Sequence, residues 1–302
     1  MKKYDKRGVS ASKKEVHKSI SKLSKGLFEN SFCKILPDLT GGNDKYANIM
    51  HADTAGSKTS LAYIYWKETG DMSVWEDIVQ DAIVMNVDDL ACIGCVDNII
   101  LSSTIGRNKH LIPQEVISEL INGTQSFIKK MKKSGINIHL SGGETADVGD
   151  IVRTVDVGIT AFTKMKKDDL IINDIQPGNV IVGLSSFGKA NYETRYNSGI
   201  GSNGLTSLRH DILSSVYTEK YPESYAPETD TNYIYSGNHL LTDKVQIDGE
   251  SIDLGKFMLS PTRTYLPILK EIFLHYKNQI KGVIHCTGGA QTKVMKLFKA
   301  GG

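Results

Sequence analysis

The first hundred residues carry apolar runs that predict two strands separated by a long helix. Ala47–Asp53 is mostly apolar and predicts a strand that delivers Asp53 at its end. Ser73 is predicted to cap a helix, because Glu76 stands at the capping-box position three residues later. Asn98–Ser102 is a short apolar run and predicts the second strand.

The next fifty residues predict a helix followed by two strands. Pro113 is a favourable residue for a first helical turn, and the helix should stop at Gly135. Ile136–Leu140 predicts a strand that ends in a turn over residues 141–145. Ile151–Thr163 alternates well enough to predict a long strand. The first half therefore mixes strands and helices, with polar or glycine turns where strands end.

The polar break at Ile172–Gly178 predicts a domain boundary, because 302 residues are too many for one ordinary core. We expect a mixed α/β fold with domains over residues 1–172 and 173–302. The elements expected in the second domain are strands at Asn179–Ser185 and Gly282–Cys286, helices at Leu205–Tyr217 and Pro261–Tyr276, and a glycine-rich loop at Gly188–Gly204. Pro267 should kink the last helix or mark its true start.

Composition and charge narrow the class of protein. The formal charge is +2, from 36 basic and 34 acidic residues, which gives no reason to expect a nucleic acid as partner. No apolar run is long enough to predict a membrane span, and the lysine-rich start does not resemble a signal peptide. We therefore expect a cytoplasmic protein. Cys92 and Cys95 are spaced as C-x-x-C, but their place at the end of a helical pattern favours small buried residues over a redox pair.

The first candidate site is Asp53-Thr54-Ala55-Gly56-Ser57-Lys58. A carboxylate at a strand end can hold Mg²⁺, which prefers one or two carboxylates together with phosphate oxygens. Small residues let backbone N–H groups approach an anion, and Lys58 supplies a point charge for phosphate. The alternative is a tight turn followed by an exposed lysine.

Two further segments carry carboxylates. Asp88 and Asp89 repel one another at a helix end unless a cation neutralises them, although a solvated acidic pair is the alternative. Gly142-Gly143-Glu144-Thr145 combines glycines that admit positive φ with a carboxylate, and the alternative there is a plain loop. Metal or phosphate chemistry is common to all three segments.

The second half adds two candidates. Gly199-Ile200-Gly201-Ser202-Asn203-Gly204 has the spacing of a dinucleotide fingerprint, but no strand directly precedes it, so a flexible lid or substrate loop fits better. His285 stands before Gly288 and Gly289 and is a candidate acid, base or phosphate contact. A core histidine is the alternative.

Six segments in order resemble the phosphoribosylformylglycinamidine cyclo-ligase family, the PurM-like aminoimidazole ribonucleotide synthetases. The matches are Asp53–Lys58 for D-G-V-G-T-K, Asn86–Leu90 for C-V-N-D-L, Gly142–Ala146 for G-G-E-T-A, Gly201–Gly204 for H-S-N-G, Ser260–Tyr265 for A-P-T-R-x-Y, and His285–Gly289 for H-L-T-G-G.

The resemblance implies a two-domain PurM-like fold in a homodimer, whose N-terminal strands form a barrel between subunits. It also implies the ATP- and Mg²⁺-dependent ring closure of formylglycinamidine ribonucleotide, a step of purine biosynthesis. Lys58 and His285 would be catalytic. The nucleotide contacts would come from Gly56, Ser57, Lys58, Gly142, Gly143, Thr145, Asn203, Arg263, Gly288 and Gly289, and the metal ligands from Asp53, Asp88, Asp89 and Glu144.

Three departures from the family pattern stand out. Glu29–Lys34 lacks the glycines that the family carries ahead of its first strand, and Asp88 replaces the usual asparagine. The sequence ends at Gly302, so relative to the family we expect an incomplete second domain.

The same superfamily includes thiamine-monophosphate kinase, selenophosphate synthetase, the hydrogenase-maturation dehydratase and formylglycinamidine synthetase, which remain alternatives. A nucleotide-binding module without catalytic activity is the alternative from another class.

Overall fold

A five-stranded mixed sheet forms the core of the protein. The structure is a computed structural model that describes residues 3–10 and 14–296. The strands lie in the order β1-β2-β5-β3-β4; β3 and β4 are parallel, and the other neighbours are antiparallel. Their bounds are Ile35–Pro37 for β1, Tyr46–Thr54 for β2, Ile99–Arg107 for β3, Ile138–Asp147 for β4 and Val155–Lys166 for β5. The mixed α/β class predicted from the sequence is confirmed.

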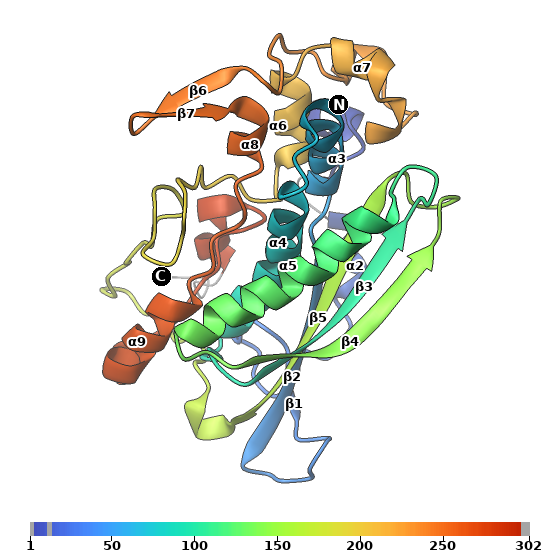
Figure 1. Cartoon of the computed structure of the whole chain (residues 1–302). Helices are drawn as coiled ribbons and strands as arrows, with labels where there is room; N and C mark the ends of the chain where they lie inside the picture. The colour runs from blue at the N-terminus through green and yellow to red at the C-terminus, as the bar shows by residue number, and fades with distance from the viewer. Residues whose placement is uncertain (1–2, 11–13, 297–302) are drawn as a thin grey trace.

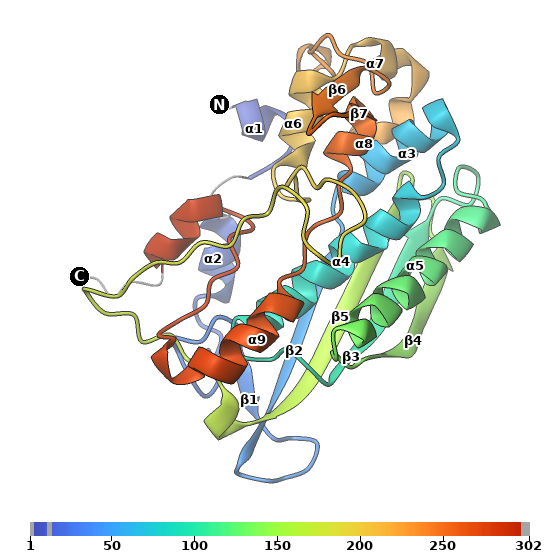
Figure 2. The same cartoon turned by 60° about the vertical axis from the view of Figure 1, so that its left-hand side comes forward.

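Two long helices cover one face of this sheet. The helix α4 (Val74–Ala91) packs on β2 and β5, and α5 (Gln114–Lys133) lies beside it and contacts β4 (Figures 1 and 2). The helix α3 (Lys58–Thr69) precedes α4. Most residues of α4 are buried, on all sides of the helix. The carboxylates on α4 therefore need partners inside the protein, because an unpaired buried charge is costly.

The other face of the sheet exposes apolar side chains. Met50, Phe162 and Ile100 are paired in one row across β2, β5 and β3. The exposed fractions of Met50 and Ile100 are 62% and 43%. Alternation along a strand puts these residues opposite Ile49 and Ala161, which are buried towards the helices.

The helix boundaries of the first half agree with the sequence patterns. Ser73 and Pro113 are the residues before α4 and α5, as predicted. The Ser73 side chain makes no capping bond to the helix; its hydroxyl instead donates to Asp71 Oδ1 at 2.6 Å. Cys92 and Cys95 are both buried, as expected for small packing residues.

The turn predicted over residues 141–145 is wrong, because β4 continues through this segment to Asp147. The register between β3 and β4 shifts by one residue after Leu101, which is a β-bulge. Gly142 sits there with φ of +113°, and a Cβ on Gly143 would come within 2.2 Å of Ser103 Oγ. The two glycines therefore serve the bulge and close strand packing.

The second half contains short helices and one hairpin. The helices are α6 (Leu205–Ile212), α7 (Val216–Lys220), α8 (Leu254–Met258) and α9 (Leu266–Tyr276), the hairpin strands are β6 (Lys244–Ile247) and β7 (Glu250–Asp253), and 3₁₀ turns cover Lys167–Asp169, Pro222–Ser224, Thr231–Tyr233, Lys277–Gln279 and Ala290–Lys296. Pro267 marks the start of α9, which is one of the two outcomes predicted for it.

The strands predicted at Asn179–Ser185 and Gly282–Cys286 are wrong, because both segments are irregular. Val180, Ile181 and Val182 have exposed fractions of 86%, 73% and 80%. Within residues 3–10 and 14–296, neither segment finds a neighbouring strand, and an apolar run needs such a ladder to become a strand.

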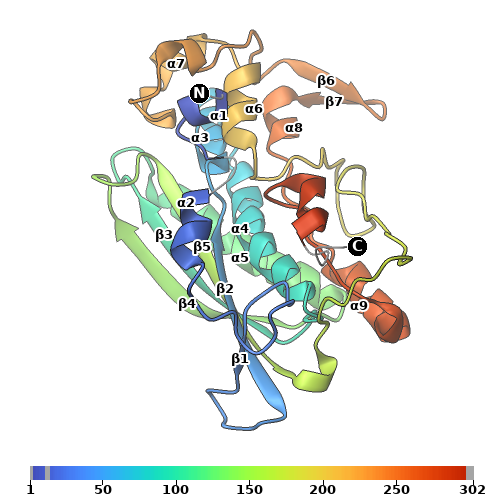
Figure 3. The same ribbon diagram turned by 180° about the vertical axis from the view of Figure 1, so that it is seen from behind.

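The N-terminal residues lie against the second half. The helix α1 (Lys3–Lys6) is beside α6, as the view from behind shows (Figure 3). Arg7 is buried and donates to the Ser207 carbonyl at 3.0 Å and to Asp211 Oδ1 at 2.8 Å. The short α2 (Lys14–Ile20) follows. No helix within the described residues has the length and apolar character to cross a membrane.

Candidate functional site

The Asp89 carboxylate lies between two histidines at the C-terminal end of α4. His285 Nδ1 is 2.7 Å from Asp89 Oδ1, and His51 Nε2 is 3.3 Å from Asp89 Oδ2. His51 comes from β2, and its Nδ1 is 3.0 Å from Asn86 Oδ1. Asn86 can only accept through this oxygen, so His51 donates from Nδ1. Three distant parts of the chain thus meet at one carboxylate.

This cluster holds a charged carboxylate among proton-carrying groups. Burial alone would raise the pKa of Asp89, but hydrogen bonds from His285 and His51 lower it to about 2. Burial disfavours protonation of His51, yet the bonds to Asp89 and Asn86 leave its pKa above the ordinary value. The imidazoles can therefore hold or move a proton beside a fixed negative charge.

Asp53 lies next to this cluster, at the end of β2. It is exposed, and its Oδ1 accepts a bond from the Thr54 backbone at 2.8 Å. His51 and Asp53 are two residues apart in the strand, so they share a face of the sheet. Gly56 follows with φ of +61°, and a Cβ added there would meet no atom within 4 Å. The backbone at Gly56 is therefore open to a ligand, whereas the next residue, Ser57, has its Oγ 2.5 Å from Thr206 Oγ1.

Lys58 does not have the free ammonium group that its prediction as a phosphate contact requires. Its side chain is fully buried, and Nζ donates to Asp81 Oδ1 at 2.9 Å, to the Ser260 carbonyl at 2.6 Å and to the Ile200 carbonyl at 3.2 Å. An ammonium group has three donors, so all of them are used. In this conformation Lys58 has no donor left for a phosphate.

Asp88 has a different environment from Asp89. It is buried, and its two oxygens accept bonds from Thr264 Oγ1 at 2.6 Å and from the Tyr265 backbone N–H at 2.8 Å. Burial raises the pKa of Asp88 to about 6, although His285 and these two bonds oppose the rise. Asp88 therefore fastens the segment before α9 to α4.

Glu144 lies far from Asp53 within one chain. Thr54, Gly158, Thr104 and Glu144 form one row across β2, β5, β3 and β4, so three strand spacings of about 4.8 Å separate the ends of the row. The bulge at Gly142 also changes the alternation, which places Glu144 with Thr104, on the face opposite Asp53.

The predicted metal ligands are therefore not assembled in one chain. Asp88 accepts bonds from Thr264 and Tyr265, Asp89 contacts two histidines, and Asp53 and Glu144 are on opposite faces of the sheet. Over the ranges that the structure describes, no three His, Cys, Asp or Glu side chains form a group suited to a metal ion. One Mg²⁺ does not fit all four carboxylates in this arrangement, because its ligands must lie at about 2.1 Å.

The other predicted contacts fall into two groups. Asn203 lies beside the turn at residues 287–290, which follows His285 and is called the His285 turn below. A Cβ on Gly288 would be 3.2 Å from Asn203 Oδ1, and Gly289 follows with φ of +91°. Thr145, in contrast, belongs to β4 together with the bulge glycines. Arg263 is occupied: its guanidinium forms a two-point ion pair with Glu193 and donates to the Ser185 carbonyl at 3.0 Å.

Two residues of this region, His51 and Asp81, were not identified from the sequence. His51 is a lone histidine within a strand, and it does not stand at a recognisable motif spacing from another candidate residue. Asp81 is the partner of Lys58 and lies in the middle of α4. Its separation by four residues from Asp77 and by seven from Asp88 is a signal that could have found it, because these spacings share one helical face.

Comparisons with known proteins agree with the motifs. Residues 35–165 match the family described as AIR synthase related protein, N-terminal domain. The chain is 28% identical over 258 residues to the phosphoribosylformylglycinamidine cyclo-ligase of Methanosarcina mazei, which covers 85% of this chain and 62% of that protein. It is also 28% identical over 253 residues to the enzyme of the same name from Methanocaldococcus jannaschii, covering 83% of this chain and 58% of that protein.

Solved structures show weaker likeness. The structure titled AaThiL complexed with AMPPCP and TMP is 11% identical, covers 86% of this chain and 61% of that chain, and has a TM-score of 0.42. A phosphoribosylformylglycinamidine synthase II from Thermotoga maritima is 14% identical, covers 52% of this chain and 22% of that chain, and has a TM-score of 0.36.

The curated relatives are longer than this chain, which spans 62% and 58% of the length of the two named above. Residues 35–165 match an AIR synthase-related N-terminal domain, and the resemblance to the phosphoribosylformylglycinamidine cyclo-ligase family that the motifs indicated is confirmed.

Proposed function

We propose that this chain takes part in the ATP-dependent closure of formylglycinamidine ribonucleotide to aminoimidazole ribonucleotide, in the cytoplasm. The observation that carries the proposal is the contact of His285 with Asp89 at one end of α4, where the strand β2 brings Asp53 beside Asn86 of the same helix. These residues come from three of the six matched motifs. Similarity to cyclo-ligases over 85% of the chain supports the same substrate class.

The proposed chemistry uses proton transfer by an oriented histidine. ATP supplies the phosphoryl group that activates the formyl amide oxygen, and a ring nitrogen then displaces phosphate. Asp89 holds Nδ1 of His285, which leaves Nε2 to donate or accept a proton at the substrate. His51 holds the second oxygen of Asp89 and so restricts its rotation.

The nucleotide is proposed to approach the open turn after β2. Gly56 offers accessible backbone there, and Ser57 is the residue directly before α3. Asn203, Gly288 and Gly289 lie near His285 and are proposed substrate contacts. Gly142, Gly143, Thr145 and Arg263 are already occupied by strand or loop packing, so we give them no direct contact within one chain.

We propose a homodimer formed through the exposed face of the sheet. The row Met50, Phe162 and Ile100 is apolar, and Glu144 lies on the same face. A second copy covering this face would remove the apolar row from water. The second copy would also bring its own carboxylates near each chain. We propose that these additional carboxylates complete the site for the Mg²⁺ that arrives with ATP.

Substitution of Ile100 by Lys tests the dimer. We expect the unmodified protein to have the mass of two chains by light scattering, and Ile100→Lys to shift it to one chain, because a charge in an apolar interface is costly. Ile121→Lys, on an exposed position of α5, is the control and should leave the mass unchanged. A monomeric unmodified protein would refute this part of the proposal.

The reaction is tested by ADP release. We expect ADP to form from Mg²⁺-ATP only when formylglycinamidine ribonucleotide is present, because phosphorylation needs the amide acceptor. Thiamine monophosphate and selenide serve as competing substrates, since the related kinases and synthetases remain alternatives. ADP release with thiamine monophosphate alone would overturn the proposal.

A nucleotide-binding module without turnover is the second candidate. Lys58, with all three donors occupied, is the observation that favours it. Saturable ATP binding by calorimetry, with no ADP release under any substrate, would support this candidate against the first.

A further inference from the structure

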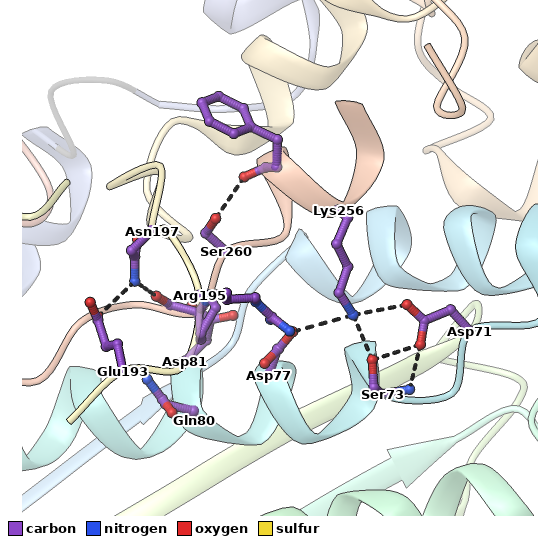
Figure 4. Close-up of polar contacts among 12 residues, drawn as sticks. Asp71, Ser73, Asp77, Gln80, Asp81, Glu193, Arg195, Asn197, Lys256 and Ser260 are labelled. Carbon is purple, nitrogen blue, oxygen red and sulfur yellow. Dashed lines mark hydrogen bonds and ion pairs between the residues drawn. The ribbon is translucent and has the colours of Figure 1, made fainter. Parts of the chain in front are cut away.

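The face of α4 that meets the second half carries a stripe of three carboxylates, two of them buried and one, Asp77, half-buried. Asp77, Asp81 and Asp88 are spaced so that they share one helical face. Asp77 pairs with Arg195 and lies 3.9 Å from Lys256 Nζ, which also contacts Asp71 at 2.9 Å (Figure 4). Every one of these carboxylates on the stripe receives donors from residues beyond 190.

Asp81 stands at the centre of the stripe and has the densest set of contacts. Its Oδ1 accepts from Lys58 Nζ at 2.9 Å, from the Thr262 backbone N–H at 2.8 Å and from Thr262 Oγ1 at 2.5 Å. The side chains of Asp81 and Lys58 are both fully buried. Its second oxygen, Oδ2, has no hydrogen-bond partner among the described residues. Burial raises the pKa of Asp81, and Lys58 and Thr262 oppose the rise.

Lys58 extends the reach of Asp81 to two further segments. It donates to the Ile200 carbonyl in the glycine-rich loop and to the Ser260 carbonyl before α9. These two segments also bind one another, because Ser198 N–H donates to Ser260 Oγ at 3.1 Å and Asn197 Nδ2 to the Pro261 carbonyl at 2.8 Å. The ion pair therefore fastens a single unit to α4.

That unit carries Asn203 to its place beside the His285 turn. Asn203 follows Ile200 by three residues and lies close to Gly288, because a Cβ added at Gly288 would be 3.2 Å from Asn203 Oδ1. Its Nδ2 is 3.9 Å from Met85 Sδ on α4. If the loop left α4, Asn203 would leave the His285 region with it.

We infer that Asp81 is a positioning residue, which acts through Lys58 and Thr262 to hold the loop that carries Asn203 at the His285–Asp89 cluster. In this role Lys58 is a structural partner of Asp81 and not a ligand of phosphate. The inference rests on the proposed function where it concerns ATP, but the seating of the loop is independent of it.

The test compares Asp81→Asn, Lys58→Met and the double variant in the full chain. Amide hydrogen exchange over residues 197–204 measures how firmly the loop is held against α4. Calorimetry with Mg²⁺-ATP measures the affinity for the nucleotide. Because both residues act as one unit, each single variant and the double variant should speed exchange by a similar factor, about tenfold, and weaken ATP binding by a similar factor. The β5 peptide should stay unchanged.

Two further variants keep the test decisive if a buried charge prevents folding. Thr262→Val removes only the hydroxyl bond to Asp81 and should speed exchange by a smaller factor, about threefold. Asp38→Asn breaks another ion pair, between the buried Asp38 and the exposed Lys164 at 2.7 Å, and should leave exchange over residues 197–204 unchanged.

Unchanged exchange in both Asp81→Asn and Lys58→Met would overturn the positioning role. Lys58→Met that loses ATP binding, beside Asp81→Asn that keeps it, would also overturn it and would return Lys58 to the phosphate. If the unmodified chain binds no ATP, the proposed function fails, while the exchange measurement still decides whether Asp81 seats the loop.

Discussion

Asp88 and Asp89 are adjacent in the chain but lie in two different regions of the molecule. Asp88 faces inward, where Thr264 and the Tyr265 backbone occupy both of its oxygens. Asp89 faces His51 and His285 at the end of α4. The same side chain therefore joins two parts of the fold at one position and orients proton-carrying groups at the next. The contacts and the burial of each carboxylate, more than its residue type, decide whether it stabilises the fold or orients catalytic groups.

The largest expected effect in this comparison is on catalysis at Asp89. Asp89→Asn keeps the shape but removes the charge that orients His285, so we expect turnover to fall by about 10²–10⁴-fold. ADP release in the presence of formylglycinamidine ribonucleotide measures it. Asp147→Asn, which touches a surface pair with Arg107, is the control and should retain activity. Equal loss in both variants would mean that Asp89 has no special role.

The next effect is on stability at Asp88. Asp88→Ala leaves the Thr264 hydroxyl and the Tyr265 N–H without their acceptors, so we expect the free energy of unfolding to fall by about 2–3 kcal/mol. Urea denaturation measures it. Asp168→Ala, at an exposed position, should change the same quantity by less than about 0.5 kcal/mol. A variant at Asp88 as stable as this control would contradict the assigned contacts.

The third effect is an opposite pH dependence at the two carboxylates. The pKa of Asp88 is raised to about 6, so its ionisation weakens the fold as pH rises from about 4 to 6. The pKa of Asp89 is lowered to about 2, so its contribution is present above about pH 4 and is lost as pH falls towards 2.

Denaturation at several pH values separates these two contributions. Relative to the unmodified chain, Asp88→Asn should gain stability between about pH 4 and 6.5, whereas Asp89→Asn should lose its deficit between about pH 4 and 2. Each change is expected to reach about 2–3 kcal/mol, because each pKa differs from its ordinary value by about two units. If the stability difference from the unmodified chain changed with pH in the same direction in both variants, the two environments would be alike.

Much of the first half could be predicted because local patterns and neighbouring strands agree there. The strand that ends near Asp53 and the helices that begin after Ser73 and Pro113 follow from periodicity and capping residues. The bulge at Gly142 could not be predicted, because it exists only in the pairing of β4 with β3. A Gly-Gly pair alone looks like a turn.

In the second half, local sequence patterns were not enough to predict the structure. Asn179–Ser185 has the composition of a buried strand, but strand formation needs a partner, and the described residues supply none. The candidate site could be predicted only in part from the sequence, for a similar reason. His285 and Asp89 could be named from their motifs, whereas His51 becomes part of the site only when β2 lies beside α4.

One experiment tests the division between Asp88 and Asp89 most directly. Asp88→Asn and Asp89→Asn are prepared in the full chain, and the free energy of unfolding and the rate of ADP release are measured for both. We expect Asp89→Asn to lose most of its turnover and to carry a stability deficit that disappears as pH falls from about 4 to 2, whereas Asp88→Asn should change stability mainly between about pH 4 and 6.5 and retain more of its turnover. The reverse assignment, with turnover lost at Asp88 and kept at Asp89, would contradict this expectation.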